Sequence, residues 1–252
     1  MIRIAGTGDL HFGTDSAGTF RPHMEGLPAL ADLLLVAGDL TRIGELSEAE
    51  ALAEELANPP VPMVAVLGNH DYHSGQEGFI RDRLERAGVR VLEGEAEVVE
   101  IDGTSVGIVG AKGFGGGFAG ACGSDFGEPE MKAFVRHTKA VSARLEELLS
   151  QLRADIRIVL LHYSPIEGTL QGERLEIYPF LGSYLLAEAV DRWGADLVFH
   201  GHAHRGVEKG VTPGGIHVRN VAQPVINHAY KVYSLAGDER SPAEAIRPGT
   251  PR

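Results

Sequence analysis

The chain has 252 residues, of which 43% are hydrophobic and 23% are charged, and its formal net charge is −12. This composition is typical of one globular domain with a substantial core, and the negative charge argues against a passive nucleic-acid or anionic-membrane surface. Cys122 is the only cysteine, which excludes an intrachain disulfide and a thiolate zinc site. Residues 1–5 have no signal-peptide pattern, and no apolar run approaches the ~20 residues of a membrane span. We therefore expect a cytoplasmic protein with no nucleic-acid and no membrane partner.

The N-terminal third alternates apolar runs with amphipathic segments, which predicts parallel strands joined by helices. The apolar runs predict strands over residues 2–6, 32–37 and 61–67. Helices are expected over residues 47–57, with Ser47 as the N-cap, and over residues 76–87, ending at Gly88. Residues 12–27 are rich in Gly, Ser, Thr and Pro, which favours a loop.

The pattern changes after residue 89. Asp102-Gly103 lies between two runs rich in β-branched residues, the typical signal of a tight β-hairpin. Four further strands are expected, over residues 156–161, 197–199, 217–221 and 230–235, together with helices over residues 129–152 and 181–193. We expect one domain over residues 1–237 and a flexible tail over residues 238–252.

The fold class that fits is α/β, with parallel strands flanked by helices and a second sheet built from the hairpin and the C-terminal strands. In such sheets, ligands bind beyond the carboxyl ends of the strands. Five of the predicted strands end in residues that can bind a metal, so one site can collect them all. These residues are Asp9 and His11, Asp39, Asn69 with His70 and Asp71, His162, and His202 with His204.

Carboxylate, amide oxygen and imidazole are the ligands of hard and borderline divalent cations. The candidate metal ligands are Asp9, His11, Asp39, Asn69, His162, His202 and His204. A carboxylate such as Asp39 can bridge two cations, and metals ~3.5–4 Å apart activate a bridging water for in-line phosphoryl displacement. His70 is suited to donate the proton to the departing oxygen, and Asp71 is expected to orient the ring of His70 as its hydrogen-bond partner. The ligand types suit manganese, iron, zinc or nickel and do not choose among them.

In chain order, these segments resemble the five-part motif of the calcineurin-like metallophosphoesterase superfamily: Asp9-x-His11, Gly38-Asp39, Gly68-Asn69-His70-Asp71, His162 and Gly201-His202-x-His204. The resemblance covers the chain to about Leu235 and implies a four-layer αββα sandwich of two mixed sheets flanked by helices. It also implies two divalent metals with Asp39 between them. One would be bound by Asp9, His11, Asp39 and His204, and the other by Asp39, Asn69, His162 and His202. His70 would be the acid or the phosphate-contacting histidine.

The resemblance implies hydrolysis of a phosphoester by attack of a metal-bridging hydroxide. Gly38-Asp39-Leu40-Thr41 followed by Gly44 is similar to small bacterial phosphodiesterases. A phosphodiesterase acting on a small diester such as a cyclic nucleotide is therefore the main hypothesis, with a small-molecule phosphoester as the partner. The alternatives are a phosphomonoesterase, a pyrophosphatase acting on a nucleotide-sugar or lipid precursor, and a non-catalytic docking module. The sequence does not indicate the oligomeric state.

A glycine-rich stretch, residues 110–127, lies between the motif-bearing segments. Gly115-x-Gly117-x-x-Gly120 matches a dinucleotide-binding fingerprint, but no helix is expected directly after it. We favour an active-site flap in which Lys112, Phe114 and Phe118 contact the substrate, and a plain surface connector is the alternative. His200, directly before the His-x-His pattern, is expected to have a supporting or structural role.

Overall fold

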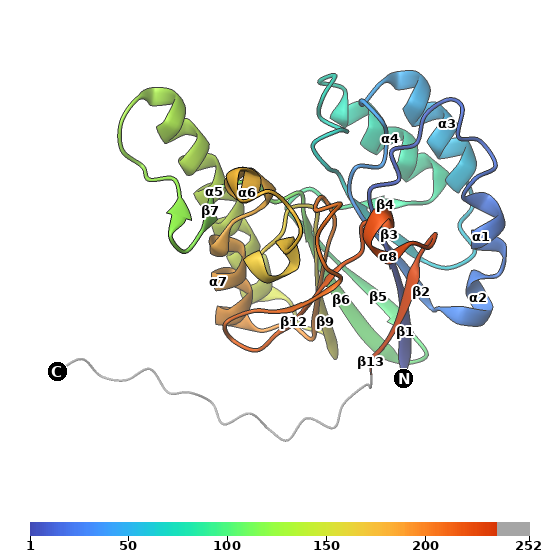
Figure 1. Cartoon of the computed structure of the whole chain (residues 1–252). Helices are drawn as coiled ribbons and strands as arrows, with labels where there is room; N and C mark the ends of the chain where they lie inside the picture. The colour runs from blue at the N-terminus through green and yellow to red at the C-terminus, as the bar shows by residue number, and fades with distance from the viewer. Residues whose placement is uncertain (236–252) are drawn as a thin grey trace.

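The computed structural model describes residues 1–235, in which two large β-sheets pack face to face (Figure 1). The flexible tail predicted over residues 238–252 lies outside the described residues. No helix in the described part of the chain is both long and apolar enough to cross a membrane.

The first sheet has five strands in the order β13-β1-β2-β3-β4. Its strands are β1 (Ile2–Thr7), β2 (Leu33–Ala37), β3 (Met63–Val66), β4 (Arg90–Val91) and β13 (Lys231–Leu235). Strands β1 to β4 run parallel, because helices connect them. The prediction that the last strand joins the second sheet is wrong, since β13 pairs antiparallel with β1 and places Tyr233 opposite Ile4.

The second sheet has six strands in the order β11-β12-β10-β9-β6-β5. Its strands are β5 (Glu95–Ile101), β6 (Thr104–Ala111), β9 (Ile156–Leu161), β10 (Leu197–His200), β11 (Lys209–Val211) and β12 (His217–Asn220). The predicted hairpin is confirmed: Asp102 and Gly103 turn the chain with φ angles of 49° and 78°. Both φ angles are positive, as a two-residue turn between twisted strands requires.

Helices cover the outer face of each sheet (Figure 1). The first sheet is covered by α1 (Arg21–Glu25), α2 (Leu27–Leu30), α3 (Leu46–Leu56) and α4 (Glu77–Ala87). The second is covered chiefly by α5 (Pro129–Gln151) and α7 (Tyr184–Trp193), with α6 (Tyr178–Leu181) beside them. The remaining short helices are η1 (Glu167–Leu170), η2 (Leu175–Ile177) and α8 (Gln223–Ile226).

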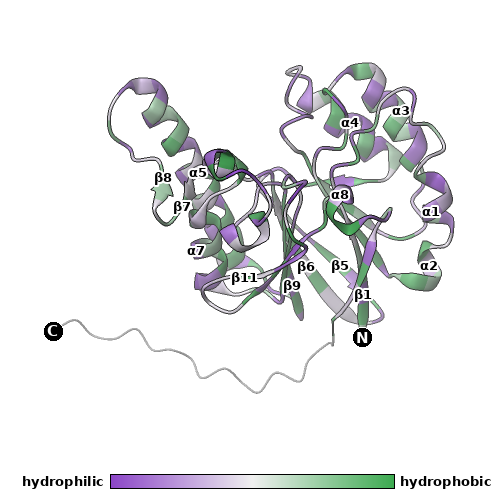
Figure 2. Cartoon of the chain, in the orientation of Figure 1, coloured by the Kyte–Doolittle hydropathy of each residue, from purple (hydrophilic) through white to green (hydrophobic). Residues whose placement is uncertain are grey.

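The core has three apolar layers, which makes the molecule the predicted four-layer αββα sandwich. Between the two sheets, apolar strand residues such as Ile4, Leu35 and Phe199 are fully buried. One further layer lies under α1 to α4 and another under α5 and α7. Apolar residues accordingly run along the strands of both sheets (Figure 2).

Three local predictions are wrong for local physical reasons. The predicted loop over residues 12–27 contains α1, which starts with Pro22 near its N-terminus and buries Met24 in the core. Helix α3 begins before Ser47, because the carboxylate of Glu48 accepts hydrogen bonds from the backbone N–H groups of Glu45 and Ile43. The helix predicted over residues 181–193 is interrupted before Tyr184, where the side chain of Ser183 caps α7.

Candidate metal centre

The predicted metal ligands, with His70 and Asp71, lie at one edge of the sandwich, where the carboxyl ends of the strands from both sheets meet. Asp9 and His11 follow β1, Asp39 follows β2, and Asn69, His70 and Asp71 follow β3 in the first sheet. His162 follows β9, and His202 and His204 follow β10 in the second sheet. Three groups of these side chains have ligand atoms within 4.8 Å of one another: Asp9, His11 and His204; His11, Asp39 and His70; and Asp39, His162 and His202.

The backbone is forced into an unfavourable conformation at four of these positions. Asp9, His11, Asp39 and His202 have φ angles of 58°, 43°, 49° and 68°. Residues other than glycine disfavour this left-handed conformation, because their Cβ approaches the following carbonyl oxygen, and the cost is about 1–2 kcal/mol per residue. Such strain concentrates at functional sites, where the surrounding structure imposes it.

The first group brings one carboxylate and two imidazoles together. Oδ1 of Asp9 lies 2.9 Å from Nε2 of His204, and this nitrogen lies 3.4 Å from Nε2 of His11. Asp9 is buried, and both of its oxygens accept the backbone N–H of His202 at 3.0 Å. The carboxylate therefore fixes the His-x-His turn as well as facing the site.

At the third group, which contains Asp39 and His162, three atoms that all present lone pairs lie close together on His162, Asn69 and Asp39. Nδ1–H of His162 donates to the carbonyl oxygen of Ala37 at 2.8 Å, so Nε2 of the neutral ring has no proton. That nitrogen lies 2.9 Å from Oδ1 of Asn69 and 3.3 Å from Oδ1 of Asp39. Ligands at right angles around a metal with bonds of about 2.1 Å are about 3 Å apart, so this donor set fits a metal ion.

Asp39 lies between the two groups. Its Oδ2 lies 3.9 Å from Nε2 of His11, whereas its Oδ1 faces His162. The side chain is buried, and Oδ1 also accepts the backbone N–H of His70 at 2.8 Å. Asp39 is therefore placed to contact one ion beside His11 and another beside His162.

Burial keeps most of the imidazoles in the neutral form that binds metals. It lowers the pKa of His11 to about 4 and that of His202 to about 3, and it holds the pKa of His162 well below its usual value. The pKa of His204 is raised, because its ring is hydrogen-bonded to Asp9. Burial also raises the pKa of Asp9, to about 6.

His70 lies at the exposed side of the cluster. Its Nδ1–H donates to the carbonyl oxygen of Arg42 at 2.5 Å, and its Nε2 lies 3.9 Å from Oδ2 of Asp39. The prediction that Asp71 orients this ring is wrong, because the carboxylate of Asp71 points into the protein. It accepts hydrogen bonds from the N–H groups of Leu40, Thr41 and Gly68 and from the hydroxyl of Thr41. Asp71 instead joins the loop after Asp39 to the loop before Asn69.

The arrangement matches a family of known proteins. The family model described as calcineurin-like phosphoesterase matches residues 2–206, which is most of the chain. The chain belongs to the calcineurin-like phosphoesterase family. These proteins are metal-dependent phosphoester hydrolases with a dinuclear centre, in agreement with the candidate ligand groups of this phosphoesterase.

Individual relatives are distant or match over a short range. An uncharacterized metallophosphoesterase of Aquifex aeolicus is 47% identical over 73 residues, which are 28% of this chain and 26% of that protein. The match thus spans about a quarter of the relative's length.

Solved structures confirm the fold. The phosphopantetheinyl hydrolase of Mycobacterium tuberculosis is similar over 87% of this chain and 88% of its own, with a TM-score of 0.62 and 19% identity. A putative 5′-nucleotidase of Staphylococcus aureus is similar over 87% of this chain and 48% of its own, with a TM-score of 0.55 and 18% identity.

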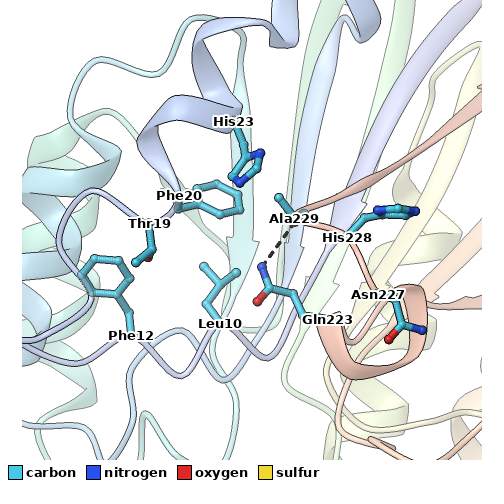
Figure 3. A pocket seen from close by; sticks show the side chains of 9 residues that line it. All are labelled: Leu10, Phe12, Thr19, Phe20, His23, Gln223, Asn227, His228 and Ala229. Carbon is cyan, nitrogen blue, oxygen red and sulfur yellow. Dashed lines mark hydrogen bonds between the residues drawn. The ribbon is translucent and has the colours of Figure 1, made fainter.

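Two cavities of the phosphoesterase include residues of the loops that carry the candidate metal ligands, which are called the ligand loops. One, of about 670 Å³, is lined by Asn69 and by the predicted substrate residues Lys112 and Phe114. The other, of about 500 Å³, lies between the loop that carries Leu10 and Phe12 and the segment from Gln223 to Ala229 (Figure 3). In this second cavity, Nε2 of Gln223 donates to the carbonyl oxygen of Ala229.

Within the predicted glycine flap, residues 115–118 are closely packed and hydrogen-bonded. The N–H groups of Gly116 and Gly117 donate to the carbonyl oxygens of Pro179 and Gly182. A Cβ on Gly117 would meet the carbonyl oxygen of Ala121 at 2.1 Å, across the small sheet of β7 (Gly117–Phe118) and β8 (Ala121–Cys122). Glycine at position 117 is therefore required for close packing. Phe118 is buried there and lines a different cavity, without Asn69.

The contacts of His200 agree with the supporting or structural role that was expected for it. It is fully buried, its Nδ1–H donates to the carbonyl oxygen of Gly201, and its Nε2 lies 2.8 Å from the hydroxyl of Thr169. Sequence reasoning missed Tyr72, Glu93 and Tyr163 in the cavity beside Asn69. The positions of Tyr163, directly after His162, and of Tyr72, directly after Asp71, gave a signal, whereas that of Glu93 gave none.

Proposed function

We propose that this phosphoesterase hydrolyses a small phosphodiester at a centre of two divalent metals. One metal is assigned to Asp9, His11, Asp39 and His204, and the other to Asp39, Asn69, His162 and His202. The observation that carries the assignment is the convergence of the unprotonated Nε2 of His162 on the oxygens of Asn69 and Asp39. Three lone pairs at such distances repel one another unless a cation lies among them.

When bound, the metals would activate a water and neutralise the charge that develops on the phosphoryl oxygens. Manganese, iron, zinc and nickel all suit the ligands. The protein's own contribution is to hold the ligands rigidly. Asp9 fixes the His202 backbone, and the carbonyl oxygen of Ala37 orients the ring of His162.

His70 is assigned the proton transfer to the departing oxygen. Its Nδ1–H is held by the carbonyl oxygen of Arg42, so Nε2 is the atom that faces the cluster. At 41% exposure, its side chain is open to a substrate, unlike the buried ring of His162. A positioned general acid of this kind contributes about 10²–10⁴-fold in rate.

The diester is favoured over a monoester because two separate cavities include residues of the ligand loops, one with Asn69 and one with Leu10. A diester has two organic groups to place, whereas a monoester has one. A phosphomonoesterase is the second candidate, because a structurally similar protein is described as a putative 5′-nucleotidase.

The deciding experiment measures hydrolysis of bis-p-nitrophenyl phosphate and p-nitrophenyl phosphate by metal-stripped protein reloaded with Mn²⁺. Metal-dependent turnover of the diester is the expected result. Turnover confined to the monoester would replace the phosphodiesterase by a phosphomonoesterase, and no turnover with two metals bound would refute both.

His70→Gln tests the proton-transfer role. We expect it to keep two bound metals and to lose at least about 100-fold in kcat. His73→Gln is the matched control, because His73 is an exposed histidine in the same loop. A His70→Gln enzyme as active as the control would remove His70 from the mechanism.

A further inference from the structure

The cavity beside Asn69 has the size of a pocket for an organic ligand. Its volume of about 670 Å³ lies within the usual range of about 300–1,000 Å³ for such pockets. It extends from Asn69 to α5, where Ala140, Val141 and Arg144 form part of its wall. A phosphoryl group bound at Asn69 can therefore carry a substituent that fills this space.

A single ammonium group lies in the wall of this cavity among three aromatic rings. Nζ of Lys112 lies 4.8 Å from the ring centre of Tyr72, 5.1 Å from that of Phe114 and 5.3 Å from that of Tyr163. The rings stabilise the cation but accept no conventional hydrogen bond. Within residues 1–235, no carboxylate forms an ion pair with this ammonium group.

Glu93 is the carboxylate in the same wall, and its oxygens are used elsewhere. One accepts the hydroxyl of Tyr72 at 2.6 Å, and the other accepts the backbone N–H of Leu67 at 3.1 Å. These bonds hold Tyr72 in place beside Lys112. The three N–H donors of Lys112 are therefore left for a ligand or for water.

The backbone of Lys112 ties the ammonium group to the metal centre. Its carbonyl oxygen accepts the N–H groups of His162 and Tyr163, both at 3.0 Å. Lys112 thus occupies a fixed place beside a candidate ligand. Arg144 adds a second cation to the wall, but its guanidinium forms an ion pair with Glu147 at 2.8 Å. Among the described residues that line this cavity, Lys112 is therefore the cation without an ion pair, and such a cation attracts anions.

We propose that Lys112 binds a second anionic group of the substrate, a carboxylate or a phosphate, carried by the organic group in this cavity. The inference rests on the proposed function and narrows it. A cyclic mononucleotide has only its cyclised phosphodiester as an anion, so the inference favours linear diesters whose organic part carries a further charge. The aromatic surroundings strengthen the contact, because a charge pair shielded from water is screened less than one in solvent.

Matched esters test the proposal on the Mn²⁺-loaded enzyme. All three esters share the anionic phosphodiester group and differ at the end of the alkyl chain. The alkyl group of butyl p-nitrophenyl phosphate is uncharged, and this compound is called the neutral ester; the two anionic esters carry a carboxylate or a phosphate at the end of a chain of similar length. A charge-assisted hydrogen bond is worth about 1.5–3 kcal/mol, so we expect kcat/KM to favour an anionic ester by about 10- to 100-fold. The better of the two anionic esters identifies the anion.

Lys112→Met keeps the length of the side chain and removes its charge. We expect the ratio of anionic to neutral kcat/KM to fall to about one in this variant. Lys139→Met is the control, since Lys139 is exposed and pairs with Asp125 on the surface. It should keep the wild-type ratio.

Two outcomes overturn the proposal. One is a wild-type enzyme that does not distinguish the esters. The other is a Lys112→Met enzyme that loses the same factor on neutral and anionic esters, because the ammonium group would then act on the phosphoryl group itself. If no ester is hydrolysed, the proposed function fails. Calorimetric binding to the wild type and to Lys112→Met then still decides the role of Lys112, with butyl phosphate and the two analogues that carry a carboxylate or a phosphate at the chain end as ligands.

Discussion

Replacement of Asp71 by asparagine tests the role that the structure gives this buried carboxylate. Its two oxygens accept four hydrogen bonds: from Leu40 N–H at 3.1 Å, Thr41 N–H at 2.8 Å, Thr41 O–H at 2.6 Å and Gly68 N–H at 2.8 Å. Each oxygen accepts two of them. An amide in the same place keeps one oxygen and turns an NH₂ group toward the other two donors.

The expected loss follows from this count. A hydrogen bond to a charged group contributes about 1.5–3 kcal/mol, so losing two costs about 3–6 kcal/mol in the free energy of unfolding. This is a large part of the about 5–15 kcal/mol that stabilises a typical domain. The same change also frees the loops that carry Asp39 and Asn69, so metal affinity should fall with stability.

Urea unfolding measures the effect on metal-loaded and on metal-stripped protein. Asp15→Asn is the matched control, because Asp15 is exposed and forms one surface ion pair, with Arg42. Exposed pairs of this kind contribute little to stability, because solvent screens them. An Asp71→Asn protein less than about 1 kcal/mol below the wild type in both states would refute the assigned role.

Two further changes test other parts of the fold. Glu55 accepts three backbone N–H groups, from Gly18, Phe20 and Arg21, and although burial opposes ionisation they lower its pKa. Because the pKa of Glu55 is lower in the folded state, its ionisation stabilises the fold above the unfolded pKa of about 4.3, and this stabilisation is lost as the pH falls through the folded pKa. Glu55→Gln should therefore lower the free energy of unfolding in urea at pH 7, and the difference from the wild type should vanish on acidification. A difference that does not change with pH contradicts this. Gly117→Ala should cost about 2–5 kcal/mol by thermal unfolding, from a steric clash and a φ of +93°. Gly120→Ala, with a φ of +83° and open space, is its control, and equal losses would leave Gly117 without a packing role.

The predictable part of this protein is the part encoded locally. Apolar runs give the strands, and the residue type at each strand end gives the candidate ligands. Because parallel strands align their carboxyl ends, these local signals are enough to place Asp9, Asp39 and His162 in one site.

Several wrong predictions concern contacts that the neighbouring sequence does not reveal. The bonds of Asp71 reach Leu40 and Thr41, about thirty positions away, and the sequence next to Asp71 offers His70 as a more obvious partner. Glycines between motifs suggest motion, whereas the spacing of Gly117 from Ala121 makes glycine necessary for packing. Strand β13 pairs with β1 across the whole length of the chain, which no periodicity indicates.

The backbone at His11 has a consequence for how this sequence can change. With a φ of 43°, its position favours glycine for folding, while its ring contacts other candidate site residues, His204 and His70. A glycine there would relieve strain and remove a candidate ligand in the same step. Selection for stability alone would therefore act against a residue that the proposed metal centre uses.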